Sequence, residues 1–422
     1  MKNTLDRDLV KDVFRAYFDA RKNKRNTNNQ LEFEMNFEHN LFALASEIQQ
    51  RTYTIGRSIC FIVNNPVKRE IFAADFRDRV VHHLIFNRIN PIVERQLISD
   101  CYSCRKGLGT AFGVERLQHH MRSVTNNHTR EAYVLKLDIQ GYFMSIDRRI
   151  LWETVSQMLR KANNKGQLAR YEETMYLLHK VIFNDPTEEC RFKSSPKSWN
   201  DLPESKSLFH SEECCGLPIG NLTSQLFSNI YLQGFDNWVK RDLKMKHYGR
   251  YVDDFYVLHN DKSVLIEIKD RMTEYLKENY GLVVHPNKIY LQDINHGVTF
   301  LGAHIKPHRK YIRHRSLGVI RHNLRMVDHS IQERKGEILD NNELYVLRSR
   351  FNSYLGHLSQ FKTYNIRKEM WKESTGYKRY FQINSNYKKI SIKPKYLPYY
   401  TEDIPDDGFL GLFPDFDIIN TP

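Results

Sequence analysis

The sequence predicts an α+β fold in which an antiparallel sheet carries helices on one face. Residues 133–139, YVLKLDI, are rich in apolar and β-branched side chains, which is typical of a strand. Residues 247–261, HYGRYVDDFYVLHND, are predicted to form a hairpin. Helical patterns lie between these segments, and another follows the hairpin. The order strand, helix, hairpin, helix, strand therefore indicates one layer of sheet and one layer of helices.

The first part of the chain is predicted to be mainly helical. Residues 9–25 and 37–53 each carry an apolar stripe at helical spacing. Residues 60–65, CFIVNN, are predicted to form a strand, and residues 113–124 show a further helical pattern.

Helices and strands continue after residue 139. Helical periodicity recurs in residues 148–159, 221–243 and 263–281. Asn221 is placed to cap the second of these helices, and Gly281 is placed to end the third. Short strands are expected within 282–293 and 298–305. Residues 184–215 contain Pro, Ser and Asn without periodicity, so they are predicted to be a loop insertion.

The charge of the chain predicts a polyanionic partner. Its 422 residues contain 64 Lys and Arg against 50 Asp and Glu, which gives a formal charge of +14 and a pI near 9.3. Nucleic acid fits this charge best. No apolar run approaches the roughly 20 residues of a spanning helix, so no membrane partner is expected. The N-terminal residues lack the apolar core of a signal peptide, and a cytoplasmic location is expected.

A pair of adjacent acids lies inside the apolar hairpin. Asp253 and Asp254 are flanked by YV and FYVL, and Asp138 ends the strand at 133–139. An isolated Asp pair is usually a polar turn. Here the flanking residues would bury it, and strands adjacent in one sheet would bring the three carboxylates together. Such a cluster requires a cation or a polar network, since like charges repel and burial disfavours ionisation.

Magnesium is the cation that this donor set suits. Mg²⁺ prefers hard oxygen ligands and takes its remaining ligands from water and substrate phosphates. Two such ions would activate a 3′-hydroxyl and hold a triphosphate, which is the chemistry of nucleotidyl transfer. The sequence therefore predicts a site for two Mg²⁺ ions, with Mn²⁺ as the alternative.

Four motifs in order resemble those of the reverse transcriptases, over roughly residues 60–360. They are LKLDIQGYFMSID at 135–147, GLPIGNLTSQLFSNIYL at 216–232, YVDD at 251–254, and HPNKI at 285–289 followed by FLG at 300–302. The resemblance implies a right-hand polymerase with mixed helical fingers, a ferredoxin-like antiparallel palm and a helical thumb. It also implies RNA-directed DNA synthesis with template RNA, an RNA–DNA duplex and deoxynucleoside triphosphates as partners.

The resemblance also implies roles for individual residues. The metal ligands would be Asp138, Asp253, Asp254 and the backbone carbonyl of Ile139. Lys288 would be the general acid that protonates pyrophosphate. The nucleotide would be bound by Lys68, Arg69, Phe143, Ile219, Gly220 and Gln225, with Phe143 as the gate against a ribose 2′-hydroxyl. Template and primer would be contacted by Arg77, Arg105, Phe300, Leu301 and Gly302, with a purely structural role open for both arginines.

The predicted domains follow the same resemblance. Fingers and N-terminal helices are expected over 1–131, and a palm over 132–305 with the insertion at about 184–215. A basic helical thumb is expected over 306–375, because residues 306–372 hold 15 Lys and Arg against 6 Asp and Glu. Residues 376–422 would form a C-terminal extension. Its end, from residue 401, has six acids and no basic residue, and either packs on the basic body or docks a partner.

The form LPIGNLTSQ at 217–225 narrows the resemblance. Ile219 stands where many retroviral-type enzymes have Gln, and the form is similar to that of diversity-generating retroelement reverse transcriptases. This resemblance implies error-prone copying of a dedicated template RNA, with an accessory protein. The alternatives left open are an antiphage-defence reverse transcriptase that copies a noncoding RNA, and an inactive RNA-binding scaffold.

Overall fold

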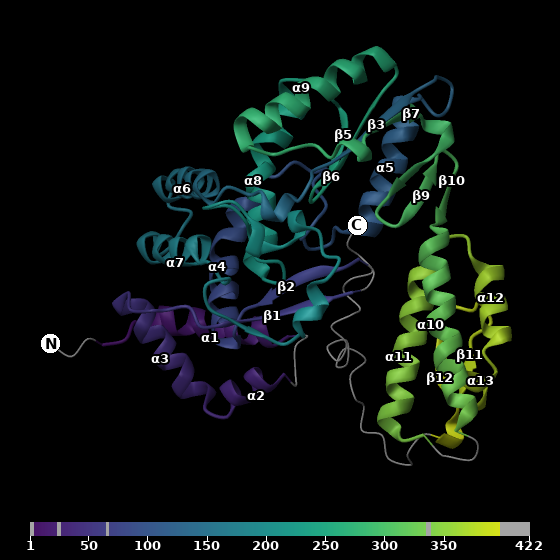
Figure 1. Cartoon of the computed structure of the whole chain (residues 1–422), viewed down its shortest axis with the longest axis horizontal. Helices are drawn as coiled ribbons and strands as arrows, with labels where there is room; N and C mark the ends of the chain where they lie inside the picture. The colour runs from purple at the N-terminus through teal and green to yellow at the C-terminus, as the bar shows by residue number, and fades with distance from the viewer. Residues whose placement is uncertain (1–3, 23–26, 65–66, 335–338, 397–422) are drawn as a thin grey trace. The chain divides into compact units, whose positions relative to one another are not determined.

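The chain forms two compact units. The computed structural model describes residues 4–22, 27–64, 67–334 and 339–396. One unit ends at Asp293 and the other begins at Ile294 (Figure 1). The predicted acidic tail lies outside the described residues.

The first unit combines helices with two sheets. Its helices are α1 (Arg7–Arg21), α2 (Asn28–Glu34), α3 (Phe37–Gln50), α4 (Phe76–Glu94), α5 (Thr110–Val124), α6 (Arg148–Asn164), α7 (Tyr171–Phe183), α8 (Leu222–Arg241) and α9 (Lys262–Tyr280). Its strands are β1 (Ser58–Val63), β2 (Arg69–Ala73), β3 (Tyr133–Asp138), β4 (Cys190–Phe192), β5 (His247–Tyr251), β6 (Asp254–His259) and β7 (Tyr290–Asp293).

Local signals place the ends of several of these helices. Asp6 caps α1 by accepting hydrogen bonds from the backbone N–H groups of Asp8 and Leu9. Asn221 stands at the N-cap position of α8, as the sequence predicts, but its side chain does not cap the helix and instead accepts a hydrogen bond from the Ala74 N–H at 3.1 Å. Gly281 ends α9 in the left-handed conformation, with φ 65°. A residue without a Cβ adopts that conformation at no steric cost, so this helix ends where the sequence predicts.

The larger sheet has the order β5-β6-β3-β7, and its neighbouring strands are all antiparallel. With helices connecting β3 to β5 and β6 to β7, this is the β-α-β-β-α-β order of a ferredoxin-like unit. The predicted α+β class and antiparallel sheet are confirmed.

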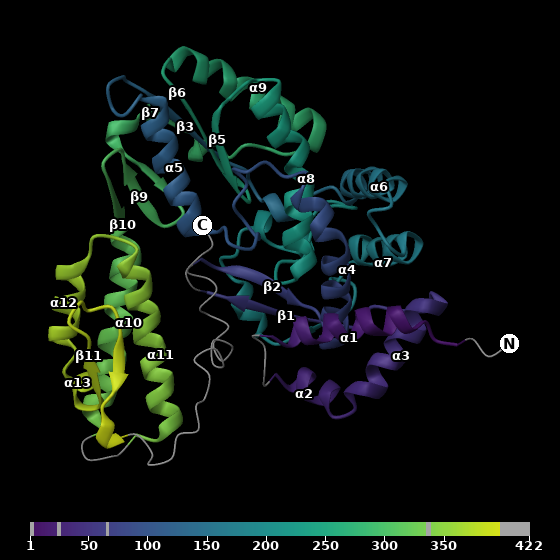
Figure 2. The ribbon, with the colours of Figure 1, turned by 180° about the vertical axis from the view of Figure 1, so that it is seen from behind.

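Helices lie on both faces of this sheet. Phe235 of α8 packs against Phe255 of β6, with ring centroids 5.6 Å apart. On the opposite face the next residue of β6, Tyr256, bonds to His120 of α5, with Oη and Nδ1 3.1 Å apart. Helix α5 lies beside this sheet (Figure 2). The sequence predicted helices on one face, and this is incomplete. The reason is that α5 comes before β3 in the chain, outside the strand and helix pattern used for the prediction, and only the tertiary fold places it against the sheet.

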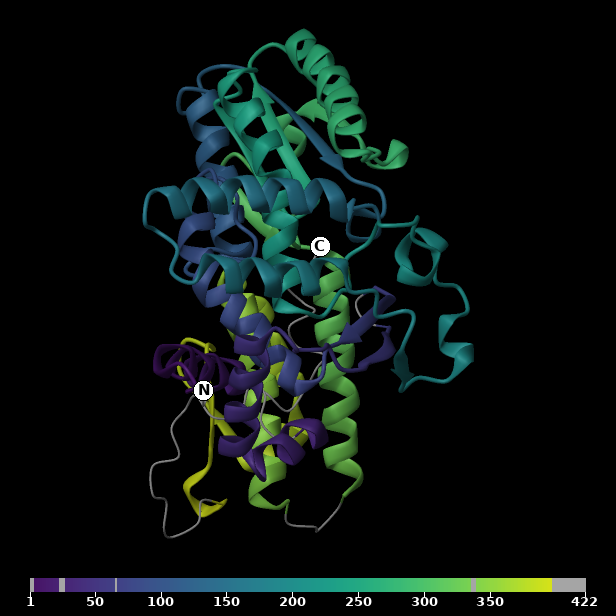
Figure 3. The same cartoon turned by 90° about the vertical axis from the view of Figure 1, so that its left-hand side faces the viewer.

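The smaller sheet has the order β2-β1-β4. Strand β2 is antiparallel to β1, whereas β4 is parallel to it. Strand β4 and the 3₁₀ turns Pro196–Trp199, Glu204–Lys206 and Leu208–His210 belong to the predicted loop insertion (Figure 3). The prediction of a loop there is therefore wrong for β4, whose three residues are too few to show a period in the sequence.

The second unit contains a small sheet followed by helices. Its strands are β8 (Val298–Phe300), β9 (Ala303–Lys306), β10 (Arg309–Ile312), β11 (Phe381–Ile383) and β12 (Ile390–Ile392). Its helices are α10 (His314–Glu333), α11 (Asn341–Ser359), α12 (Tyr364–Glu373) and α13 (Thr375–Tyr380). Strands β8, β9 and β10 form an antiparallel meander.

The helices of the second unit are joined by polar contacts. Asp328 of α10 accepts a hydrogen bond from the backbone N–H of Tyr377 in α13, at 2.9 Å. Arg325 of α10 forms an exposed ion pair with Glu373 of α12, at 3.2 Å. Part of the basic charge predicted for duplex binding is thus balanced inside this unit. Within the described ranges, no helix has the length and apolar content needed to cross a membrane.

Candidate active site

The register of the larger sheet brings the predicted acids together. Asp138, the last residue of β3, lies directly opposite Asp254, the first residue of β6. Residues paired in this way have Cα atoms about 4.5–5.5 Å apart, and their side chains lie on the same face. Asp253 is in the two-residue turn that joins β5 to β6. Acids separated by more than a hundred residues therefore meet at one end of the sheet.

Two lysines contact this cluster. Lys136 Nζ lies 3.0 Å from Asp254 Oδ2, and Lys288 Nζ lies 2.8 Å from Asp138 Oδ1. Lys136 precedes Asp138 by two residues on β3, so both side chains lie on the same face. Lys288 reaches the site because Val284 bridges Ile139 and His285 N–H donates to the Asp138 carbonyl oxygen at 2.8 Å.

Burial and like charge raise the pKa values of two of these carboxyls. Burial, followed by the charge of Asp138, raises the pKa of Asp253 to about 6, although Arg69 and Lys288 oppose the shift. Burial also raises the pKa of Asp254 to about 7, and Lys136 opposes that shift most strongly. The free energy of ionising this cluster is therefore high, and added positive charge would lower it.

The donor set fits a divalent cation. Asp254 Oδ1 is buried and accepts no hydrogen bond from any residue that the structure describes. Carboxylate oxygens are the ligands that Mg²⁺ prefers. Among the described residues no three His, Cys, Asp or Glu side chains form a ready-made metal cluster. Instead, the lysines supply positive charge to Asp138 and Asp254.

The two basic residues predicted to bind triphosphate lie at the start of β2. Arg69 is the first residue of β2 and lowers the pKa of Asp253 through its charge. Lys68 donates a hydrogen bond from Nζ to the backbone carbonyl of Asn200 in the insertion. Arg69 therefore acts on the carboxylate cluster, whereas Lys68 holds the insertion.

Phe143 and Ile219 pack against one apolar cluster. Its buried members are Cys60, Phe72, Met144 and Leu208. Phe143 O accepts a hydrogen bond from Leu217 N–H at 2.8 Å, and Ile219 O accepts one from Phe72 N–H at 2.9 Å. The structure thus brings together two residues that the sequence assigned to the nucleotide from motifs about 75 positions apart.

Gly220 and Gln225 follow Ile219 toward α8. Gly220 has φ 120°, and a Cβ on it would lie 2.8 Å from Ile71 Cγ2, so only glycine fits this close approach to β2. Gln225 is exposed in the first turns of α8.

Arg77 and Arg105 have internal partners. Arg77 pairs with Glu47, donates to Thr54 O at 3.0 Å and lies over the Tyr53 ring. Arg105 pairs with Glu94 at 2.8 Å and donates to two backbone carbonyls. Of the two roles that the sequence left open, these contacts favour the structural one.

Phe300, Leu301 and Gly302 lie in the second unit. Phe300 is buried at the end of β8, and Leu301 and Gly302 form the turn to β9 with φ values of 49° and 78°.

Two contributing residues were missed by sequence reasoning. Lys136 could have been found, because residues i and i+2 of a strand share a face and Asp138 was already assigned. Arg250, fully buried against Asp236 of α8 at 2.7 Å, could not have been found. The sequence does not show that Arg250 of β5 will form an ion pair with Asp236 of α8.

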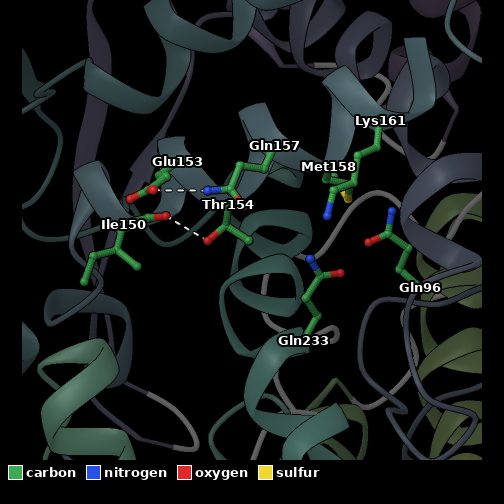
Figure 4. Close-up of a pocket in the computed structure, with 8 residues that line it drawn as sticks. All are labelled: Gln96, Ile150, Glu153, Thr154, Gln157, Met158, Lys161 and Gln233. Atoms are coloured by element: carbon green, nitrogen blue, oxygen red, sulfur yellow. Dashed lines mark hydrogen bonds between the residues drawn. The ribbon is translucent and has the colours of Figure 1, made fainter. Parts of the chain in front are cut away.

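A separate polar pocket of about 190 Å³ lies between α6, α8 and the segment after α4 (Figure 4). It is lined by Gln96, Ile150, Glu153, Thr154, Gln157, Met158, Lys161 and Gln233. None of these residues was predicted to bind nucleotide, metal or nucleic acid.

Comparison with known families agrees with this geometry. The model of the family described as reverse transcriptase (RNA-dependent DNA polymerase) matches residues 67–305, which is more than half of the chain. The chain belongs to the reverse transcriptase family. The matched range contains the whole of the larger sheet and every predicted site residue. Reverse transcriptases generally use divalent metal ions, which agrees with the donor set described above.

Individual relatives of this reverse transcriptase are distant. Protein YkfC of Escherichia coli (strain K12) is 23% identical over 285 residues, which cover 58% of this chain and 65% of YkfC. The chain therefore spans less than two thirds of that relative. Two structures of apo telomerase from Candida tropicalis are also similar. The structure truncated from the C-terminal domain is 13% identical, with a TM-score of 0.43. The match covers 61% of this chain and 55% of the telomerase chain. The other structure is 11% identical, with a TM-score of 0.44. The match covers 77% of this chain and 58% of the telomerase chain.

Proposed function

We propose that this reverse transcriptase is an RNA-directed DNA polymerase that copies a dedicated template RNA into cDNA. The observation that carries the proposal is the pairing of Asp138 with Asp254 beside Asp253, within the part of the chain that matches the family. A cluster of hard oxygen donors, in which Asp253 and Asp254 have raised pKa values, suits nucleotidyl transfer supported by Mg²⁺.

Different side chains would bind the cations and the triphosphate during nucleotidyl transfer. Asp138, Asp253 and Asp254 would hold the divalent cations, with the carbonyl of Ile139 as a further ligand. When bound, these ions activate the primer 3′-hydroxyl and stabilise charge on the transferred phosphate. Arg69 would bind the triphosphate, because its positive charge already acts on Asp253.

Two further residues complete the proposed site. Phe143 would fill the space that a ribose 2′-hydroxyl requires, and its packing against the apolar cluster holds the ring in place. Lys288 Nζ, 2.8 Å from Asp138, would hold the proton that leaving pyrophosphate accepts.

A role in diversity generation is the finer part of the proposal. Ile219 puts an apolar side chain where many retroviral-type enzymes have the amide of Gln. The structure packs Ile219 against the cluster that also contacts Phe143. Loss of a polar contact near the nucleotide would lower discrimination between correct and incorrect bases.

Primer extension with the purified chain tests this proposal. The assay contains a primed RNA, deoxynucleotides and Mg²⁺. Asp253→Asn is expected to lower extension by about a thousandfold, since several kcal/mol of charge stabilisation would be lost. RNA binding should be unchanged. Asp270→Asn, which alters an acid 68% exposed on α9, serves as the control and should extend normally.

The same products, once sequenced, test the finer role. Substitutions concentrated at template adenines are expected for a diversity-generating enzyme. An even spread over all template bases would contradict that role and leave the defence alternative. Full extension by Asp253→Asn would overturn the assignment of Asp253 to the catalytic site. RNA binding by a wild-type chain that extends no primer would instead support an inactive scaffold.

A further inference from the structure

The turn that carries Asp253 contains a strained residue. Val252 has φ 56°, in the left-handed region. A β-branched residue rarely occupies this region, because its Cβ lies too close to the following carbonyl oxygen. Such strain persists only where neighbouring contacts impose it. The contacts of Val252 therefore bear on how Asp253 and Asp254 are held.

Side chains bind both peptide groups of Val252. Its N–H donates to Ser103 Oγ at 3.2 Å, and its carbonyl oxygen accepts from Arg250 Nη1 at 2.9 Å. Ser103 and Arg250 are both fully buried. Within a buried site each of these bonds would be costly to lose, because the polar group would find no water to replace its partner.

Both side chains are themselves fixed. Ser103 Oγ donates to Asn229 Oδ1 at 2.9 Å, and Asn229 Nδ2 donates back to Ser103 O at 2.8 Å. Arg250 donates from Nη2 to Asp236 Oδ2 at 2.7 Å and from Nε to Asp236 Oδ1 at 2.8 Å. Asn229 and Asp236 both belong to α8. The long helix thus anchors the two groups that hold Val252.

The segment that contains Ser103 is attached to the hairpin along its backbone. Arg250 N–H donates to Asp100 O at 2.9 Å, and Tyr102 N–H donates to Arg250 O at 3.0 Å. Cys101 forms a parallel bridge with Arg250. Ser103 therefore approaches Val252 from a backbone that is already in register with β5.

We propose that Ser103 and Arg250 are positioning residues that hold Val252 in the left-handed conformation and so fix Asp253 and Asp254 in the active site. The proposal deepens the polymerase function and rests on it. A purely structural polar network would stabilise the fold without acting on this turn. Here both hydrogen-bonding groups of the strained residue are bound, and the next two residues are the catalytic acids.

Glycine at position 252 separates the two explanations. Glycine adopts positive φ without the penalty of a Cβ, so a turn with glycine at position 252 does not need the hydrogen bonds from Ser103 and Arg250 to hold it. Four proteins are compared in primer extension: wild type, Ser103→Ala, Val252→Gly and the double variant. With Val252 in place, Ser103→Ala is expected to lower kcat about tenfold, which corresponds to about 1.4 kcal/mol, with KM for the deoxynucleotide within about threefold. When Val252→Gly is already present, the same change should lower kcat by less than about threefold.

Hydrogen exchange gives a readout that does not depend on activity. In Ser103→Ala, amide exchange in a peptide spanning residues 250–255 is expected to quicken, because the Val252 N–H loses its acceptor. Ser156→Ala is the matched control. It removes a buried hydroxyl of α6 that has no hydrogen-bond partner among the residues described, and it should change neither readout.

Two results would overturn the proposal that Ser103 and Arg250 hold Val252. One is an equal loss of kcat from Ser103→Ala with and without the Val252→Gly change. The other is unchanged exchange over residues 250–255. If the wild-type chain extends no primer, the polymerase function fails, and the exchange result alone still decides whether Ser103 holds the turn.

Discussion

At the scale of single residues, the two lysines of the carboxylate cluster differ in exposure. The side chain of Lys136 is 17% exposed and its partner Asp254 is 3% exposed. The side chain of Lys288 is 47% exposed and its partner Asp138 is 18% exposed. Solvent screens the Lys288 pair, whereas loss of Lys136 would leave a nearly buried carboxylate without its cation.

Replacement of each lysine by Met should therefore give different results. Lys136→Met is expected to lower the free energy of unfolding by about 2 kcal/mol, since it breaks a largely buried pair. Lys288→Met should lower stability by less than about 1 kcal/mol, as for exposed pairs. It should nevertheless reduce kcat for extension at least about tenfold if Lys288 protonates the leaving group. Denaturant unfolding and primer extension measure the two effects, and equal stability losses would contradict the comparison.

At the scale of elements, one buried acid fixes the insertion to the smaller sheet. Glu70 of β2 is 1% exposed and accepts three hydrogen bonds from the insertion. They come from Trp199 Nε1 at 2.7 Å, Ser207 Oγ at 2.9 Å and the backbone N–H of Leu208 at 2.7 Å. Leu208 belongs to the apolar cluster that Phe143 packs against, and Trp199 packs against the same cluster. The insertion is therefore a support for the proposed nucleotide gate.

Substitution of Glu70 should loosen this element. Glu70→Gln removes the charge that strengthens three hydrogen bonds and leaves an amide that cannot accept all of them, at a cost of about 2 kcal/mol. Limited proteolysis is expected to cut more rapidly within residues 190–210. Glu189→Gln is the control, because Glu189 is 71% exposed and its pair with Arg57 is 3.5 Å long. Equal cleavage of both variants would show that Glu70 does not hold the insertion.

At the scale of the whole molecule, buried histidines make the first unit sensitive to acid. His82 of α4 bonds to Thr223 of α8, and His120 of α5 bonds to Tyr256 of β6. Burial lowers the pKa of each histidine to about 3. Both are neutral in the folded chain, whereas in the unfolded chain they titrate near 6.5. Their contribution to stability is therefore complete above pH 6.5 and is lost as pH falls toward 3.

His82→Asn should reduce this acid sensitivity. Asparagine keeps a hydrogen-bonding side chain for Thr223 but does not titrate. Between pH 7.5 and pH 5.5, the free energy of unfolding of the wild type should fall relative to that of the variant by about 1 kcal/mol. His329→Asn is the control, since His329 is 71% exposed. Thermal unfolding at the two pH values measures the difference. If the stability difference between the wild type and the variant is the same at both pH values, the prediction is contradicted.

Local patterns accounted for much of the fold. The strand 133–139, the hairpin and the helix that ends at Gly281 were predicted because each signal lies within a short stretch of chain. Strand β4 was not predicted, because its pairing with β1 joins residues about 130 positions apart. The internal partners of Arg77 and Arg105 were unpredictable for the same reason. A basic residue in a sequence does not show which acid it will meet.

The sequence by itself determined the family, the candidate acids and the strand and hairpin that carry them, because motifs and periodicity are local properties. Only the tertiary structure decided that Asp138 stands opposite Asp254, that Lys136 and Lys288 supply charge to these acids, and that Val252 is left-handed between Ser103 and Arg250. These facts depend on strand register and on the packing of α8 against the hairpin. Both are set by contacts between distant segments, which no single stretch of the chain encodes.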